Sequence, residues 1–291
     1  MTQSLINSDG RVMAAIDPSV YAASVADHAA WAATRLGAEL ELLHVIARHP
    51  GMAPLDLSGN LSMDTTQALL GELAALDEQR AKIAQAHGRE LLQQLQADVI
   101  AKSGVNATLS QRHGGLVDTL LDLEKDTRLI VIGKRGQHAD FAKGHLGSNL
   151  ERVVRAVHRP VLVAAREFRP INRFLVAFDG SATTRTCIEV ICATSLLRNV
   201  ECHELMVGED TTDHREALAW AQSQLTQAGF APTMHLLQGS ADATIAQQVD
   251  TLKADLLVMG AYGHSRIRTM ILGSTTTQLL RTCHIPVLLL R

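Results

Sequence analysis

The chain has 291 residues, of which 46% are hydrophobic and 3% aromatic, and its formal net charge at pH 7 is -3. This length fits about two domains, and the near-neutral charge gives no basic surface for nucleic acid, so no nucleic-acid partner is expected. The polar start of the chain and the lack of an apolar run near ~20 residues predict neither a signal peptide nor a membrane span.

The first half alternates short apolar runs with stretches in which apolar residues recur at helical spacing, which predicts strands and helices in turn. Glycines and prolines mark residues 46–68 as a loop. The long helix that follows has apolar residues from Leu69 to Val99, and Gly88 inside it predicts a possible bend. The predicted strands are 11–16, 40–45, 107–111, 129–132 and 161–165, and the other predicted helices are 19–36, 116–123 and 148–157.

The second half repeats this series. Its predicted strands are 174–178, 200–206, 233–237, 256–259 and 287–290, and its predicted helices are 184–197, 213–228, 241–252 and a run that ends at Cys283. Such alternation predicts an α/β fold of two tandem doubly wound five-stranded parallel-sheet domains, in the order 3-2-1-4-5, with helices on both faces. We place the domains at 1–168 and 169–291, with about 35 extra residues between strands 2 and 3 of the first.

A glycine loop followed by a helix comes after the fourth strand of each half. Glycine lets the backbone approach a ligand, and a helix N-terminus offers N–H groups and the positive end of a dipole, which suit phosphate. In the second half the residues are Gly260, Gly263, Gly273 and Ser274, with nine spacer residues before the third glycine. In the first half they are Gly133, Gly136, Gly147 and Ser148, with ten spacer residues.

An aspartate ends the first strand of each half, Asp17 in one and Asp179 in the other. In an open parallel sheet of order 3-2-1-4-5, the ligand cleft lies at the C-terminal ends of strands 1 and 4. Each aspartate should therefore face its glycine loop, where it can accept hydrogen bonds from a base or sugar. The alternative is that the aspartates only cap the following helices, helped by Ser19 and Ser181.

These motifs resemble the universal stress protein family in its tandem, two-domain form. The family's ATP-binding loop reads Gly, two residues, Gly, nine residues, Gly, then Ser or Thr, and the second half matches it from Gly260 to Ser274. The family aspartate that contacts adenine maps to Asp179 and Asp17. The resemblance implies ATP as ligand, with or without Mg²⁺, a cytoplasmic location, dimer-like pairing and a role in the stress response. The longer spacer of the first half departs from the pattern.

Other catalytic and metal motifs are absent from the sequence. There is no P-loop lysine, no Gly-x-Ser-x-Gly elbow and no zinc-type Cys/His spacing, so we expect a regulator with at most weak ATP hydrolysis. An adenylate- or phosphate-transferring enzyme is a third hypothesis. The loop cations either neutralise phosphates or form a solvated face. They are Lys134, Arg135, Lys143, Arg266 and Arg268.

The closing strands of the two halves, 161–165 and 287–290, are apolar edges, and unpaired edges associate. We predict that they pair with one another, and a homodimer of the whole chain is also possible. The four cysteines lack a Cys-x-x-Cys pair, which predicts reduced thiols. The alternative function is a binding module for an anionic or lipid-like, non-nucleotide ligand held by the enlarged first domain.

Overall fold

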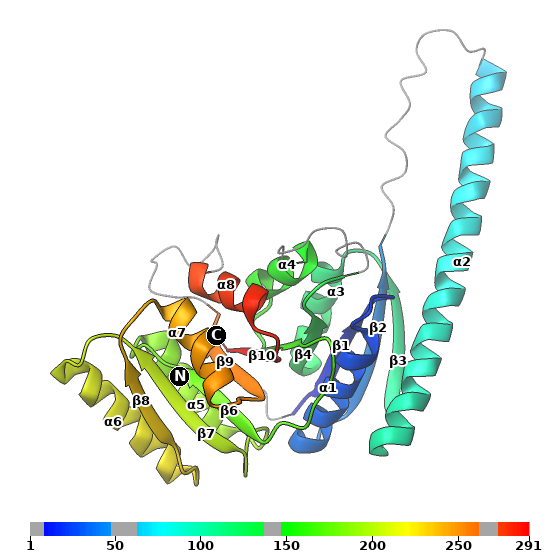
Figure 1. The fold of residues 1–291 in the computed structure, drawn as a ribbon. Helices are drawn as coiled ribbons and strands as arrows, with labels where there is room; N and C mark the ends of the chain where they lie inside the picture. Colours follow the sequence, from blue (N-terminus) through cyan, green and yellow to red (C-terminus); the bar gives the residue numbers. More distant parts are fainter. Residues whose placement is uncertain (1–8, 48–62, 137–146, 262–272, 291) are drawn as a thin grey trace.

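The computed structural model describes residues 9–47, 63–136, 147–261 and 273–290. A single sheet crosses the molecule, and helices cover both of its faces (Figure 1). The strands are β1 (Arg11–Ile16), β2 (Leu40–Ile46), β3 (Ala107–His113), β4 (Thr127–Gly133), β5 (Val161–Ala164), β6 (Arg173–Ala177), β7 (Glu201–Val207), β8 (Thr233–Leu237), β9 (Leu256–Gly260) and β10 (Val287–Leu290). The helices are α1 (Ala22–Leu36), α2 (Met63–Ser103), α3 (Leu116–Leu123), the short 3-10 helix η1 (Glu124–Asp126), α4 (Ser148–Ala156), α5 (Ala182–Ala193), α6 (Thr212–Gln227), α7 (Ala241–Thr251) and α8 (Ser274–Thr282).

The strand order of the sheet is β3-β2-β1-β4-β5-β10-β9-β6-β7-β8. Each half therefore has the predicted order 3-2-1-4-5, and its strands are parallel. The α/β fold class is confirmed. One detail differs from two separate five-stranded sheets: β5 and β10 pair antiparallel, as predicted for the closing strands, and this pairing joins the halves into one ten-stranded sheet.

The join between the halves is nearly symmetric. Leu288 lies opposite Leu162 in the β5–β10 pair, and both hold the same position in their halves, two residues after Pro286 and Pro160. An approximate two-fold axis therefore passes through this pair. Leu162 is fully buried and Leu288 is 2% exposed, so each apolar edge strand removes the other from water.

The helices divide evenly between the two faces of the sheet. The buried residues of α1, α2, α5 and α6 form one apolar cluster, and those of α3, α4, α7 and α8 belong to a second cluster on the other face. In β1, Val12 and Ala14 face the first cluster while Met13 faces the second. Strands buried on both faces are mostly apolar, which explains why β1 and β4 do not alternate with polar residues.

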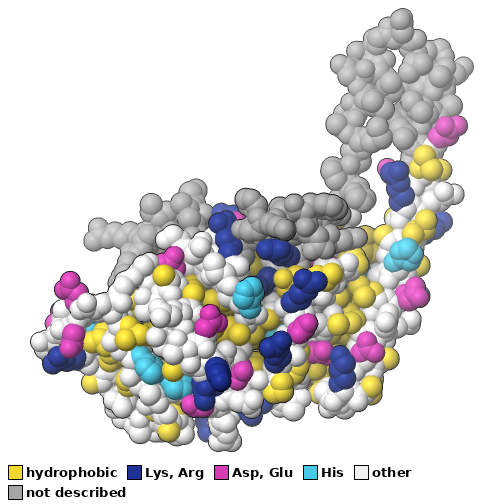
Figure 2. All heavy atoms as spheres, in the orientation of Figure 1, with side chains coloured by type: hydrophobic (Ala, Val, Ile, Leu, Met, Phe, Trp, Pro, Cys, Tyr) yellow, Lys and Arg dark blue, Asp and Glu magenta, His cyan; other side chains and the backbone are white. Residues whose placement is uncertain are grey.

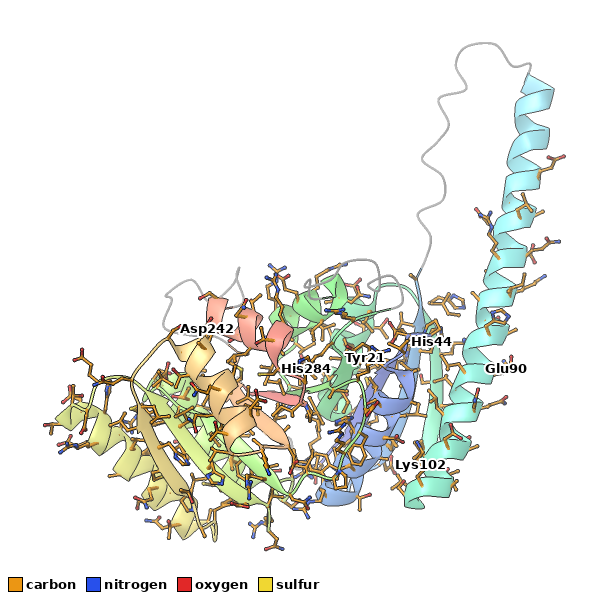
Figure 3. The ribbon with its side chains drawn as sticks, in the orientation of Figure 1. Tyr21, His44, Glu90, Lys102, Asp242 and His284 are labelled. Atoms are coloured by element: carbon orange, nitrogen blue, oxygen red, sulfur yellow. The ribbon has the colours of Figure 1, made fainter. Side chains whose placement is uncertain are left out.

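The extra residues of the first half contribute the long helix α2, whose first part extends away from the rest of the molecule (Figure 1). Leu95 and Val99 pack in the core, whereas Leu76 and Ile83 are 50% and 57% exposed. Hydrophobic side chains are visible on the surface of the extended part of α2 (Figure 2). The described part of the insertion therefore packs on the sheet through the C-terminal half of α2, from about Gln85 onward. Lys102 closes this end by an ion pair with Asp27 of α1, 2.9 Å long (Figure 3).

Gly88 does not interrupt α2, which continues through it to Ser103. A Cβ at Gly88 would lie 2.3 Å from the side-chain nitrogen of Gln111 and 2.4 Å from the ring of His44. The glycine is thus required by close packing of β2 and β3 side chains against the helix, and the bend considered from the sequence is not needed.

The predicted helix 184–197 was too long, because α5 ends at Ala193. Thr194 adopts an extended backbone, and its hydroxyl accepts a hydrogen bond from the Leu196 N–H at 3.3 Å. A threonine side chain that bonds to a nearby amide competes with the helix. Leu196 and Leu197 are buried after the helix ends, so their apolar character suggested a helix that is not there.

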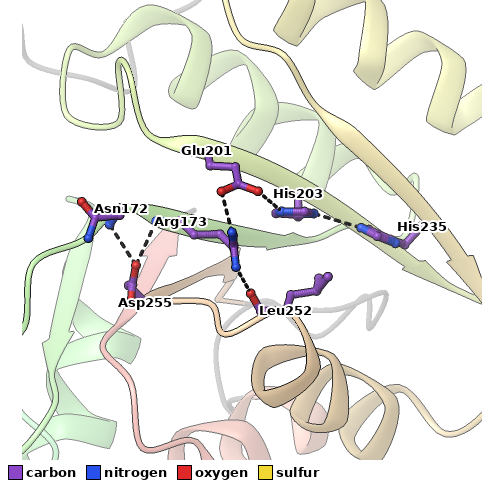
Figure 4. A network of polar contacts seen from close by, with 7 residues as sticks. All are labelled: Asn172, Arg173, Glu201, His203, His235, Leu252 and Asp255. Atoms are coloured by element: carbon purple, nitrogen blue, oxygen red, sulfur yellow. Dashed lines mark hydrogen bonds and ion pairs between the residues drawn. The ribbon is translucent and has the colours of Figure 1, made fainter.

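A polar network holds the N-terminal ends of the second-half strands, at the opposite edge from the glycine loops (Figure 4). Glu201 accepts from Arg173 at 2.7 Å, and its other oxygen lies 2.9 Å from Nε2 of His203. The Nδ1 of His203 lies 3.0 Å from Nε2 of His235. The hydrogen bond from Arg173 is the largest cause of a lowered pKa at Glu201. The network fixes three strand starts relative to one another.

Candidate functional site

The first glycine loop closes on itself at the C-terminal end of β4. The N–H of Gly147 donates to the carbonyl oxygen of Lys134 at 3.3 Å. A Cβ on Gly147 would lie 3.4 Å from that oxygen and 3.5 Å from the nitrogen of Gly136. Gly136 and Gly147 therefore lie together although the spacer of this half is one residue longer, and Gly147 is the N-cap of α4.

Asp17 lies against this loop, as the strand order predicted. A Cβ on Gly136 would lie 2.9 Å from Oδ2 of Asp17, while Oδ1 accepts from the Ser19 hydroxyl at 2.6 Å. Tyr21, at the start of α1, covers Gly133, where a Cβ would lie 2.9 Å from the tyrosine Cβ (Figure 3). Both glycines are thus places where a side chain would collide with the strand 1 connection.

The second half brings its aspartate and glycine together through a threonine. Oδ1 of Asp179 accepts from the Thr184 hydroxyl at 2.7 Å and from the Ser181 N–H at 2.9 Å. A Cβ on Gly260 would lie 3.7 Å from Cγ2 of the same threonine and 3.9 Å from the sulfur of Cys187. Burial, and then the charge of Asp179, raises the pKa of the Cys187 thiol to about 12, so the aspartate is close to this site.

The capping alternative describes part of what these turns do. Ser181 is the N-cap of α5, and its hydroxyl accepts from the Thr184 N–H at 3.3 Å. In the first half the Ser19 hydroxyl accepts from the Tyr21 N–H at 3.2 Å. The serines thus satisfy backbone N–H groups at the start of the helices, and the aspartates bind the same turns while lying next to the glycine loops.

The N-terminus of α8 is placed beside Gly260. Gly273 is its N-cap and Ser274 its first residue, and Thr276 is buried with its hydroxyl 3.4 Å from the Gly260 carbonyl oxygen. The first turn of α8 contains no acidic residue, whereas that of α4 contains Glu151. A phosphate should therefore be less opposed electrostatically at α8 than at α4.

Sequence reasoning missed two residues that organise the second site, Thr184 and Thr276. The available signals were the position of Thr184 three residues after the Ser181 cap and the run of hydroxyl residues at 274–277. Both were read only as parts of helices. In the structure, Thr184 donates a hydrogen bond to Asp179 and lies beside Gly260, and Thr276 joins α8 to the end of β9.

Several predicted residues are not placed. Gly263, Lys143, Arg266 and Arg268 lie outside the described residues, and Ser148 is described through its backbone alone. Arg135 is half-buried beside the loop.

Lys134 lies within the described residues, and its position matches neither interpretation of the loop cations, phosphate neutralisation or a solvated face. It is only 8% exposed, and its Nζ donates to backbone carbonyls of the other half.

Within the part of the chain that the structure describes, no group of three or more His, Cys, Asp or Glu residues could hold a metal ion, and no helix could cross a membrane. All four cysteines are free, as predicted. A small apolar cavity of about 30 Å³ lies between the halves, near Leu36, Leu129, Ile191 and Leu288. It has room for about one water molecule and is too small for a lipid chain.

The fold is that of a tandem, doubly wound α/β protein in which an aspartate and a glycine follow neighbouring strands at their C-terminal ends in each half. The model of the Universal stress protein family matches residues 10–165 and 170–291. The universal stress protein Slr1230 of Synechocystis sp. is 36% identical over 96% of this chain and 99% of its own length. The chain therefore belongs to the universal stress protein family.

Solved structures show the same tandem fold. A universal stress protein from Archaeoglobus fulgidus DSM 4304 superposes with a TM-score of 0.68 at 21% identity, over 97% of this chain and 98% of that one. A putative universal stress protein from Pseudomonas aeruginosa UCBPP-PA14 has a TM-score of 0.63 at 17% identity, over 96% and 92% of the two chains.

Proposed function

We propose that this protein is a cytoplasmic stress-response regulator that binds ATP. Binding of ATP would change its binding partners or its stability. The observation that carries the proposal is the repeated juxtaposition of an aspartate with a glycine loop. Asp17 lies directly against Gly136, and Asp179 is hydrogen-bonded to Thr184, whose methyl group lies beside Gly260. In this proposal the carboxylates accept hydrogen bonds from base or ribose, and the loop and helix N–H groups hold phosphates.

The second cleft is proposed as the principal site. Its loop has the spacing of the family's ATP-binding motif, and the α8 N-terminus has no acid in its first turn. Gly273 and Ser274 would contact the phosphates, Gly260 and Gly263 would allow close approach, and Asp179 would face the nucleoside. The equivalent residues of the first half, from Asp17 to Ser148, would form a second, weaker site. Any Mg²⁺ would enter with the phosphates of ATP.

Turnover is proposed to be slow or absent. Oδ1 of Asp179 already accepts hydrogen bonds from the Ser181 N–H and the Thr184 hydroxyl, and the sequence has no motif that supplies a general base or a nucleophile. Binding of ATP without fast hydrolysis fits a regulator in which the ATP-bound state of the protein is itself the signal.

Isothermal titration of the chain with ATP tests the proposal, because Asp179→Ala should weaken the tighter site about tenfold or more, the effect of losing one hydrogen bond to a charged group. Asp17→Ala should affect the weaker site. Asp122→Asn, on the exposed surface of α3, is the matched control and should leave both affinities unchanged.

Equal ATP affinities in the wild type and the Asp179→Ala variant would contradict the site. Native mass spectrometry of the purified chain distinguishes nucleotide binding from the alternative function. An amphiphile that co-purifies in place of a nucleotide would support a non-nucleotide ligand.

A further inference from the structure

The side chain of Lys134 leaves the first glycine loop and enters the second half of the molecule. Its backbone belongs to the loop, since the Lys134 carbonyl accepts from the Gly147 N–H at 3.3 Å. Its Nζ donates to the carbonyl oxygen of Ile285 at 3.0 Å and also to that of Cys283. One residue therefore joins the phosphate loop of one half to the backbone of the other.

The carbonyls that Lys134 binds follow the C-terminal end of α8. Cys283 is the C-cap of this helix, and the next residue, His284, leads toward β10 (Figure 3). Carbonyl groups at a helix C-terminus lack intrahelical partners, and a cation there is favoured by the helix dipole. The N-terminus of α8 is the phosphate end of the second candidate cleft. A nine-residue helix thus has Lys134 at one end and Ser274 at the other.

Among the described residues this link occurs once, and it runs from the first half to the second. The position equivalent to Lys134 in the second loop is Ala261, whose N–H donates to Leu290 at 2.8 Å within its own half. The segment equivalent to residues 283–285 is 157–159, and its N–H groups at His158 and Arg159 donate to Glu124 of the same half. The contact is therefore a feature of the tandem chain and not of the repeated domain.

The burial of this amine costs stability. Desolvation is the largest cause of a lowered pKa at Lys134, to about 8, which means that the folded protein disfavours the charged form. Buried charges are commonly replaced by apolar residues without loss of stability, and the second half has alanine at this position. Departures from simple packing rules concentrate at functional positions.

We propose that Lys134 is a positioning residue that couples the two candidate clefts, by fixing the first glycine loop on the C-terminal end of the helix that begins at the second. The coupling rests on the proposed function, because its ligand is the proposed nucleotide. The contact of Lys134 with the other half does not depend on that proposal. A ligand that moves the first loop would pull on α8, and a ligand at the α8 N-terminus would in turn stabilise the first loop.

The link is tested first without ligand, by hydrogen–deuterium exchange of the full chain. Lys134→Ala introduces the residue that the second loop has at the equivalent position. Lys134→Met keeps the apolar stem of the side chain and serves if the alanine variant folds poorly. Both should raise exchange at Gly147 and in the last turn of α8, two segments that come from different halves. Lys102→Ala, which removes the surface ion pair with Asp27, is the matched control and should leave both segments unchanged. Unchanged exchange in both Lys134 variants would overturn the positioning role.

The coupling is tested by ATP titration of the second cleft, with the first loop intact or disabled by Gly136→Val. With Lys134 present, disabling the first loop should change the second-cleft affinity about fivefold, the lower end of usual allosteric coupling. In the Lys134→Ala background the change should fall below about twofold. The same fivefold change in both backgrounds would refute the coupling. If the wild type binds no ATP, the proposed function and the coupling both fail, and the exchange result alone decides whether Lys134 positions the loop.

Discussion

Asp17 and Gly136 lie so close together that a Cβ on the glycine would be 2.9 Å from Oδ2 of the aspartate. The residues come from the ends of β1 and β4, which are neighbours in the sheet. The carboxylate is held in place by the hydroxyl of Ser19 at 2.6 Å. A side chain at position 136 therefore meets the group that we assign to nucleoside recognition.

Gly136→Ala should displace Asp17 and weaken ATP binding at the first cleft about tenfold, which corresponds to about 1.4 kcal/mol. Calorimetric titration would show this as a weaker first site, while the affinity of the second site changes by no more than the roughly fivefold coupling expected above. The control is a double-mutant cycle, because Gly136→Ala should cost much less in an Asp17→Ala background, where the clash is absent. Additive effects of the two substitutions would contradict a direct contact.

Thr184→Val should weaken the second cleft, because valine keeps the shape but removes the hydroxyl that donates to Asp179 at 2.7 Å. We expect a loss of about 1 kcal/mol in the free energy of unfolding and a several-fold lower ATP affinity. Thr186→Val is the comparison, since the hydroxyl of the half-buried Thr186 donates to the Ala182 carbonyl within α5. If both valine variants bind ATP equally well, Thr184 does not position Asp179.

Glu204→Leu should stabilise the protein. Glu204 is fully buried in β7, neither oxygen has a hydrogen-bond partner among the described residues, and Leu42 occupies the equivalent position of β2. Burial raises the pKa of Glu204 to about 8 from an ordinary value of 4.5. Between these values the folded state holds a proton that the unfolded chain has released. The free energy of unfolding should therefore fall as pH rises, by at most about 1.4 kcal/mol per pH unit.

Urea unfolding between pH 4.5 and 8 would measure this effect as the difference between the wild type and Glu204→Leu. The variant should gain most at pH 8 and least near pH 4.5. Glu167→Gln in the exposed connection between the halves is the control. A constant difference across the pH range would mean that Glu204 does not titrate as its burial predicts.

Lys134 should make the free energy of unfolding rise with pH, which is opposite to the effect of Glu204 and occurs in a higher pH range. Its pKa in the folded protein is about 8, against an ordinary value of 10.5. Between these values the unfolded chain binds more protons, so this residue makes the free energy of unfolding rise with pH, by at most about 1.4 kcal/mol per unit. Lys134→Met should remove that contribution, and Lys102→Met should retain it. Parallel pH profiles of wild type and Lys134→Met would exclude a buried, titrating amine.

Leu288→Arg should break the join between the halves, because the arginine would be buried opposite Leu162 in the β5–β10 pair. We expect a loss of about 3 kcal/mol or more in the free energy of unfolding, as for other unpaired buried charges. Leu121→Arg on α3 is the control, since Leu121 is 38% exposed. An unfolding midpoint unchanged by Leu288→Arg would show that the strand pair does not hold the halves together.

Much of the fold was predictable from local patterns in the chain. Continuous apolar runs such as 129–132 and helical spacing such as that of 19–36 mark elements whose stability depends on burying one face or both, and these patterns are written in consecutive residues. The repeated glycines after the fourth strands and the aspartates after the first strands also follow from strand order, because parallel strands end at the same edge. The meeting of Asp17 with Gly136 was therefore expected.

Other features depend on contacts between residues far apart in the chain, which only the tertiary structure decides. Lys134 was expected either to neutralise a phosphate or to lie on a solvated face, yet its amine donates to carbonyls of the other half, at Cys283 and Ile285. From the sequence, Gly88 suggested a possible bend in α2, but in the structure it makes room for the side chains of His44 and Gln111. Local pattern determines which elements form and where a ligand loop begins. The partner of each buried polar group is set by how the two halves pack, since that packing alone determines which groups lose water and which find a hydrogen bond.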